Sequence, residues 1–164
     1  MTSGDLLLRA PIESEPYKNN RWIMRFPSNL GISEWTLQSA SRPSIKQASR
    51  PIEFLNTETY VAGRYTWDSV QVTFRDFIAP STSQALMEWI RLCSESVSGR
   101  QGYAAGYKRD VELELLDPTG VCTQLWILKN AWISDCNFGN LQYSDDNIAT
   151  ITATLVIDYA ILAY

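Results

Sequence analysis

The stretch "VAGRYTWDSVQVTFRDF" (residues 61–77) decides the fold class of this chain, because its second half alternates strictly in polarity. The alternation places six consecutive residues on two sides of an extended backbone: Val70, Val72 and Phe74 against Gln71, Thr73 and Arg75. Successive side chains of a β-strand point to opposite faces of the sheet. The pattern therefore predicts a strand with one face toward a core and a polar face whose role the rest of the chain must explain.

The segment "PSTSQALMEWIRLCSESVSG" (residues 80–99) changes to a helical period. Ser81 and Gln84 have the spacing of a capping box, and Gly99 is typical of a residue just past a helix end. We therefore predict one principal helix at about residues 82–98, covering the apolar face of the sheet. Its core stripe consists of Leu86, Trp89, Ile90, Cys93 and Val97.

Extended segments on both sides of this helix predict the remaining strands, at residues 21–26, 34–41, 44–56, 111–116, 122–135 and 148–159. The tetrapeptide "DPTG" has the composition of a turn, so residues 111–135 should form a hairpin. Residues 51–69 begin at Pro51 and contain Gly63, two residues that disfavour a central strand of a sheet. We therefore predict that this segment forms a long hairpin-like excursion from the domain.

The last predicted strand repeats the two-faced pattern of the first stretch. Its apolar face carries Ile151, Ala153, Leu155, Ile157 and Tyr159, and its polar face carries Thr150, Thr152, Thr154 and Asp158. We expect an α+β, mainly β fold in which antiparallel strands form a small barrel or sandwich beside one principal helix. Residues 1–20 should be an N-terminal arm, and residues 21–164 a single domain.

Composition excludes several classes of function. A net charge of −4 without any run of Lys or Arg argues against a groove that grips nucleic acid. The absence of histidine removes Ser-His and Cys-His catalysis and most catalytic zinc sites. The three cysteines are odd in number and form no CxxC pair, which predicts idle thiols in a reducing compartment. With no signal peptide and no membrane-length apolar window, we expect a soluble protein made in the cytoplasm.

The remaining candidates for chemistry are better explained by structure. Asp145 and Asp146 lack the ligand spacing of an EF-hand, and a solvated turn explains them better. Glu112 and Glu114 share a strand face without the second carboxylate region that a glycosidase needs. The glycine-bearing loop before Lys108 lacks the ending of a phosphate-binding loop. We therefore expect no catalytic, cofactor-binding or metal residues, no cofactor, and a protein that is not an enzyme.

Two blocks resemble the tail tube proteins of contractile (T-even-like) bacteriophages. The first is "YVAGRYTWDSVQVTFRDF" followed by the helix "QALMEWIRLCS", and the second is "LWILKNAWISDCNFGNLQYSDDNIATITATLVIDY". The resemblance extends from about Arg21 to Tyr159 and depends on the order of the segments, because no single motif is diagnostic. The first twenty residues and the terminal "AILAY" depart from the family pattern. The family is related in fold to tube proteins of injection systems and of type VI secretion.

The resemblance implies a structural protein that works by self-assembly. Family members form homohexameric rings that stack into a hollow tube inside a contractile sheath, with baseplate and tail terminator proteins at the ends. The lumen holds a tape-measure protein and then conducts DNA, without sequence-specific binding, into the host. Four strands from each of six subunits would give a barrel of about 24 strands, roughly 50 Å across. The expected location is the virion tail, assembled in the host bacterial cytoplasm without a membrane.

The resemblance also implies roles for particular residues. The polar strand faces would line the lumen, which makes the candidates Gln71, Thr73, Arg75, Thr150, Thr152, Thr154 and Asp158. The excursion exposes apolar side chains that a monomer would not need, so it is the candidate for the ring-to-ring contact. The residues concerned are Phe54, Leu55, Tyr60 and Val61.

Three alternatives stay open from sequence. The chain is also compatible with the inner tube of an extracellular contractile injection system, which conducts protein cargo, and with a tube-initiator ring of the baseplate. A monomeric ligand-binding β-barrel is the third alternative, and it would contain an internal apolar pocket.

Overall fold

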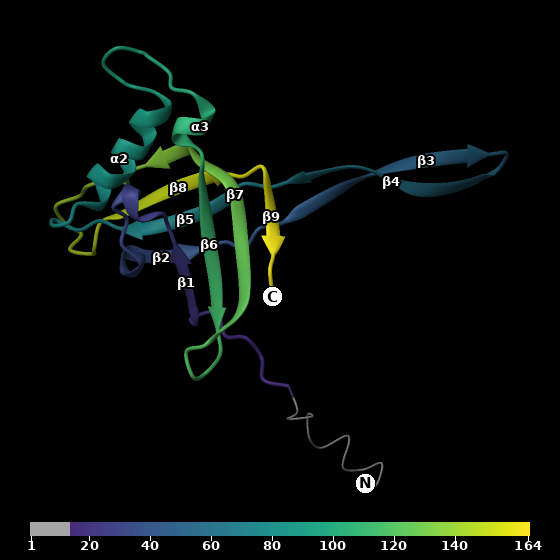
Figure 1. The fold of residues 1–164 in the computed structure, drawn as a ribbon, viewed down its shortest axis with the longest axis horizontal. Helices are drawn as coiled ribbons and strands as arrows, with labels where there is room; N and C mark the ends of the chain where they lie inside the picture. Colours follow the sequence, from purple (N-terminus) through teal and green to yellow (C-terminus); the bar gives the residue numbers. More distant parts are fainter. Residues whose placement is uncertain (1–13) are drawn as a thin grey trace, which may run out of the picture.

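The computed structural model describes residues 14–164, in which antiparallel strands dominate and two α-helices pack at one side (Figure 1). The helices are α2 (Thr82–Cys93) and α3 (Ala104–Tyr107). Two 3-10 turns, η1 (Ser28–Leu30) and η2 (Glu34–Thr36), precede the second strand. The strands are β1 (Trp22–Arg25), β2 (Leu37–Ala40), β3 (Ile45–Phe54), β4 (Thr57–Trp67), β5 (Val70–Arg75), β6 (Arg109–Leu116), β7 (Cys122–Asn137), β8 (Thr150–Val156) and β9 (Tyr159–Leu162).

Seven strands form one bent sheet in the order β1-β6-β7-β8-β5-β2, with β9 also paired to β7. All of these pairs are antiparallel, and β3 and β4 form a separate two-stranded ribbon. The α+β, mainly β prediction is confirmed, and the sheet stays open rather than closing into a barrel within one described chain. The predicted hairpin of residues 111–135 is present as β6 and β7.

Strand β7 joins the two halves of the sheet. Its first part, as far as Ala131, pairs with β6, and its last part, from Trp132 to Asn137, pairs with β8. The predicted single strand over residues 148–159 is wrong in one respect, because the chain breaks after β8 and resumes as β9. At this break the Asp158 N–H donates to the Lys129 carbonyl at 3.1 Å. Tyr159, predicted on the apolar face, therefore begins a new strand and is largely exposed.

The alternation in residues 70–75 is confirmed by burial. Val70, Val72 and Phe74 are fully buried, and they pair with the similarly buried Leu155, Ala153 and Ile151 of β8. Removing such side chains from water is the main favourable term in folding. The core therefore lies between the bent sheet and the helical side of the molecule.

Helix α2 covers this core as predicted, through Leu86 and Trp89. The Trp89 indole N–H donates to the Tyr107 carbonyl at 2.8 Å, which connects α2 to α3. The Trp89 ring lies edge-on to Phe26, with 6.1 Å between ring centroids. Of the other predicted stripe residues, Ile90 packs against the core, and Cys93 is partly buried.

The predicted helix length is wrong at its C-terminal end. Helix α2 ends at Cys93, because Ser94 is extended and the Gly102 N–H donates to the Cys93 carbonyl at 3.0 Å. Residues 94–101 therefore form a narrow loop instead of another helical turn. Val97, predicted in the core stripe, is 94% exposed in this loop. The N-terminal end is as predicted, since the Ser81 hydroxyl accepts from the Gln84 N–H.

The N-terminal arm predicted over residues 1–20 lies mostly outside the described residues, which begin at residue 14. Within residues 14–164, every helix is too short or too polar to cross a membrane.

Candidate assembly surfaces

The polar face of the sheet is a continuous surface across four strands, β2, β5, β8 and β7. One row of directly opposed residues runs across all four strands: Ser39, Thr73, Thr152 and Asn137. A second row consists of Gln71, Thr154 and Asp135. Arg75 and Thr150 are paired at the end of the β5–β8 ladder. Because the opposite face of β5 and β8 is fully buried, these polar side chains form the face of the sheet that points away from the core. We call this polar face of β2, β5, β8 and β7 the wall.

The structure brings together six of the seven sequence-predicted lining residues in these rows. It adds Ser39, Asp135 and Asn137, which sequence reasoning missed because only the strand register reveals their place beside the threonines. The wall consists mainly of hydroxyl and amide groups, with one acid and one guanidinium. The Arg75 guanidinium donates to the Leu37 carbonyl at 3.2 Å, which holds it along the sheet.

Asp158, the seventh predicted lining residue, lies apart from the threonine rows. It follows β8 in the connection to β9, where Lys108 forms an ion pair with it at 3.2 Å. The Asn130 side-chain amide donates to Asp158 at 2.9 Å. That hydrogen bond, with a further contribution from Lys108, lowers the pKa of Asp158. The carboxylate thus stabilises the break between β8 and β9 instead of extending the wall.

A second carboxylate holds the same region of β7. Lys129 donates to Asp110 at 2.9 Å, and the Asn130 N–H donates to the same carboxylate at 3.1 Å. The hydrogen bond from Lys129 lowers the pKa of Asp110. Asn130 has a positive φ of 56°, a conformation that asparagine tolerates better than most residues. These contacts fix the point at which β7 passes from one half of the sheet to the other.

The β3–β4 hairpin projects from the body as a long arm (Figure 1). All ten residues of β3 are exposed, and β4 is exposed except near Gly63 and Trp67. A strand of ten residues spans about 33 Å. An isolated two-stranded ribbon is at best marginally stable in water, so contacts made outside the ribbon would stabilise this arm.

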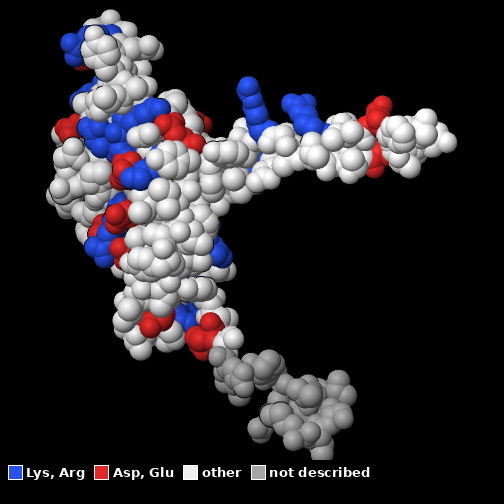
Figure 2. All heavy atoms as spheres, turned by 45° about the vertical axis from the view of Figure 1, so that its right-hand side comes forward, with Lys and Arg blue, Asp and Glu red and all other residues white. Residues whose placement is uncertain are grey.

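The end of the arm exposes apolar side chains, which Glu53 and Glu58 flank. The predicted contact residues all lie on the arm and are exposed: Phe54 at 72%, Leu55 at 89%, Tyr60 at 63% and Val61 at 48%. Figure 2 shows Lys and Arg on the arm near the body, acidic residues farther out, and an uncharged tip. Leu55 has a positive φ of 53° in the tip turn, where glycine is usual. An apolar residue in this conformation is a candidate for a functional role.

The residues considered for chemistry have structural explanations. The Asp145 carboxylate accepts from the N–H of Asn147 at 3.0 Å and closes a turn. Glu114 forms an ion pair with Arg25 at 2.9 Å. Burial raises the pKa of the Cys136 thiol to about 11, so it stays protonated at neutral pH. Among residues 14–164, no three His, Cys, Asp or Glu side chains are grouped to hold a metal ion.

Solved structures with a similar fold come from contractile injection systems. The cap that terminates the tube of the anti-feeding prophage has a TM-score of 0.72 at 17% identity, covering 96% of this chain and 97% of the cap. The chain also matches the sheath/tube terminator of the extracellular contractile injection system PVC. That match has a TM-score of 0.74 at 17% identity, covering 93% of this chain and 99% of the terminator. Hcp1 from Flavobacterium johnsoniae matches with a TM-score of 0.55 at 10% identity, and the match covers 87% of this chain and 94% of Hcp1.

A search of curated protein sequences finds no significant match. The model of one protein family, described as T4-like virus tail tube protein gp19, matches residues 30–161. The matched range begins at the last residue of η1, includes the projecting arm and α2, and ends within β9. This chain therefore belongs to the T4-like virus tail tube protein gp19 family.

Proposed function

We propose that this protein is the repeating subunit of a phage tail tube and that it acts by assembly rather than by catalysis. Six copies would form a ring, and stacked rings would form a hollow tube inside a contractile sheath. The observation that carries the proposal is the four-stranded wall of β2, β5, β8 and β7. Its inner face is covered by the subunit's own core, whereas its polar face has no partner among the described residues.

The edges of this wall support ring closure. Strand β2 pairs only with β5, and the last part of β7 pairs only with β8, within the described chain. Exposed strand edges readily pair with strands of another chain. Pairing the β2 edge of one subunit with the β7 edge of the next would join six walls into one barrel of about 24 strands, roughly 50 Å across. Such a barrel leaves a channel, because side chains cannot fill an interior of that width.

The wall chemistry fits the passage of DNA. Phosphate contacts to Lys and Arg dominate affinity for DNA, and the wall offers only Arg75, which is balanced by Asp135. Hydroxyl and amide groups keep the channel wet without a strong field. A wall of this kind conducts the tape-measure protein and then DNA without holding either of them.

The other surfaces have corresponding roles in this proposal. The helical side faces outward toward the sheath, and the β3–β4 arm forms the ring-to-ring contact. Baseplate and tail terminator proteins bind the two ends of the tube, which places the protein in the virion tail. The described domain carries all of these surfaces.

Two measurements test the proposed assembly. Light scattering on the purified protein should show particles of six times the 18.6 kDa chain mass, or multiples of that unit. For the channel, Thr152→Cys should react with a small maleimide in intact tubes but not with a polymer-linked maleimide too large for the bore. Glu88→Cys, on the exposed face of α2, is the matched control and should react with both. Equal reaction of both variants with the large reagent would show that the wall does not line a channel.

A further inference from the structure

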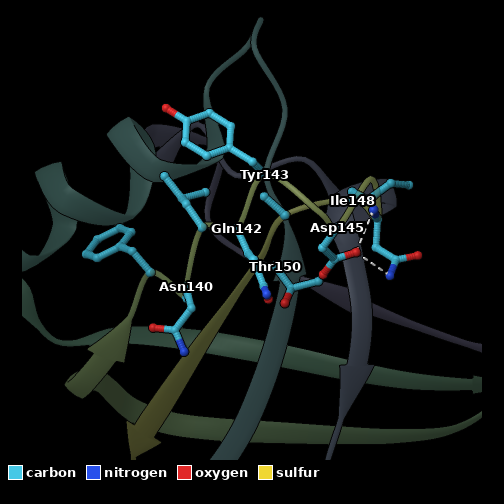
Figure 3. Close-up of a pocket in the computed structure, with 11 residues that line it drawn as sticks. Asn140, Gln142, Tyr143, Asp145, Ile148 and Thr150 are labelled. Atoms are coloured by element: carbon cyan, nitrogen blue, oxygen red, sulfur yellow. Dashed lines mark hydrogen bonds between the residues drawn. The ribbon is translucent and has the colours of Figure 1, made fainter.

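The loop between β7 and β8 exposes apolar side chains around a hollow of about 410 Å³ (Figure 3). Leu141 is 92% exposed, and Tyr143 is completely exposed. Ile148 and Phe138 also line the hollow and are more than two-fifths exposed. Clustered apolar side chains of this kind mark interaction surfaces on soluble proteins.

Several hydrogen bonds hold the loop in shape. The Gly139 N–H donates to the Asn137 side chain at 2.9 Å, and the Asp76 N–H donates to the Ala149 carbonyl at 2.9 Å. Gly139 has a φ of 81°, and a Cβ added there would lie 2.8 Å from the Thr150 carbonyl oxygen. Only glycine fits this position without displacing backbone. The apolar side chains are therefore presented by a formed loop.

The loop and the projecting arm lie at opposite ends of the same strand ladder. The arm enters β5 at Val70, which pairs with Leu155, whereas the loop enters β8 at Thr150, which pairs with Arg75. Figure 1 shows the arm leaving one side of the body and the β7–β8 connection at the other. Two different patches at opposite ends of one chain that bind each other make a heterologous contact, which repeats as an open stack when its rotation does not close a ring.

We propose that the β7–β8 loop is the acceptor for the arm, so that the Phe54–Leu55 tip of a subunit in one ring enters the hollow of a subunit in the next ring. This inference rests on the proposed tube, and it names the partner surface that the arm binds. Both partners carry acids beside the apolar contact, Glu53 and Glu58 on the arm and Asp145 and Asp146 on the loop. Burial of apolar surface, and not charge pairing, therefore holds the two together.

Cross-linking tests the contact directly, because Leu55 and Tyr143 are both exposed and replacing them removes no core packing from the monomer. A chain carrying Leu55→Cys and Tyr143→Cys is assembled and treated with a short bis-maleimide, which bridges thiols without disulfide geometry. We expect a ladder of covalent chains longer than six, because each subunit is linked to one ring above and one below. The unsubstituted chain controls for Cys93, Cys122 and Cys136.

The matched control pair is Leu55→Cys with Val97→Cys, since Val97 is equally exposed on a different loop. Tubes that give no ladder with Tyr143→Cys, or an equal ladder with Val97→Cys, would overturn the acceptor while leaving the tube intact. An unsubstituted protein that forms neither rings nor tubes would instead contradict the proposed function.

A pair of opposite charges introduced across the contact gives an independent test if the double cysteine variant does not stack. Leu55→Asp alone should shorten tubes, because it replaces an apolar side chain of the contact with a carboxylate that would lie in a hollow already lined by Asp145. Adding Tyr143→Arg should restore at least half of the lost length, whereas adding Val97→Arg should restore none. Equal restoration by both arginine variants, or by neither, would overturn the acceptor.

Discussion

Trp89 illustrates how one residue connects the helix to the sheet. Its ring is almost completely buried beside Phe26, and its indole N–H reaches the Tyr107 carbonyl of α3. Tryptophan buries a large apolar surface but needs a partner for its N–H, and both needs are met here. Val97 had the same helical spacing in the sequence, yet it contacts none of this core.

Truncation of Trp89 should therefore destabilise the subunit strongly. Trp89→Ala leaves a cavity, and we expect the free energy of unfolding to fall by about 3–5 kcal/mol. Trp89→Phe keeps most of the ring and loses the hydrogen bond, and it should cost about 1 kcal/mol. Val97→Ala should change stability by less than about 0.5 kcal/mol. Urea denaturation measures all three, and an equal effect of Trp89→Ala and Val97→Ala would contradict the packing described for α2.

At the scale of elements, periodicity predicted the strands and the helix that bury apolar faces. Residues 70–75 and 111–116 alternate because a single core covers one side of each strand, so their sequence contains enough information. The end of α2 could not be predicted, because Gly102 caps it from across a loop. The place of Asp158 depended on Lys108 and Asn130, which are distant in sequence and meet it only in the fold.

The same limit applies to the candidate surfaces. The threonine face was visible in the sequence, whereas Ser39 and Asn137 joined it only through register. Residues 140–147 show only the composition of a turn, since the apolar residues there have no period, and Ile148 is predicted as the start of the last strand. Their grouping around one hollow is a property of the folded loop.

The acidic network at the β8–β9 break makes stability depend on pH. The folded-state pKa values of Asp158 and Asp110 lie below the ordinary 3.8, so the stabilisation is present above that pH. It is lost as the pH falls through the lowered values. Asp158→Asn should be less stable than the unsubstituted chain near neutral pH, and the difference should shrink as the pH falls below 3.8. Urea denaturation across that range, with exposed Asp146→Asn as control, measures the difference; a constant difference at every pH would contradict the assigned role.

The arm is the element whose proposed role is easiest to separate from folding. Tyr60→Asp or Val61→Asp places a charge on an exposed ribbon, so the subunit and the ring should survive while stacking weakens severalfold. Mean tube length in electron micrographs measures this effect. Val97→Asp is the control on another exposed loop. Tubes of unchanged length in both arm variants would count against a stacking role.

At the scale of the whole molecule, charge opposes assembly. Each chain carries a formal charge of −4, so neighbouring rings of the proposed tube would repel one another. Salt screens exposed charges beyond about 10 Å at 0.1 M ionic strength. We therefore expect longer tubes as sodium chloride is raised over this range, with sedimentation measuring the assembled fraction. Shortening of tubes by salt would indicate that ion pairs, rather than apolar burial, hold the rings together.

In the proposed tube, the polar wall, the free strand edges and the arm are parts of an assembly that a single chain cannot complete. Negative-stain electron microscopy of the purified protein at high concentration tests this claim most directly. The proposal predicts six-fold rings with an open centre, together with stacks of such rings. A uniform field of monomers, without rings or tubes at any concentration, would contradict it.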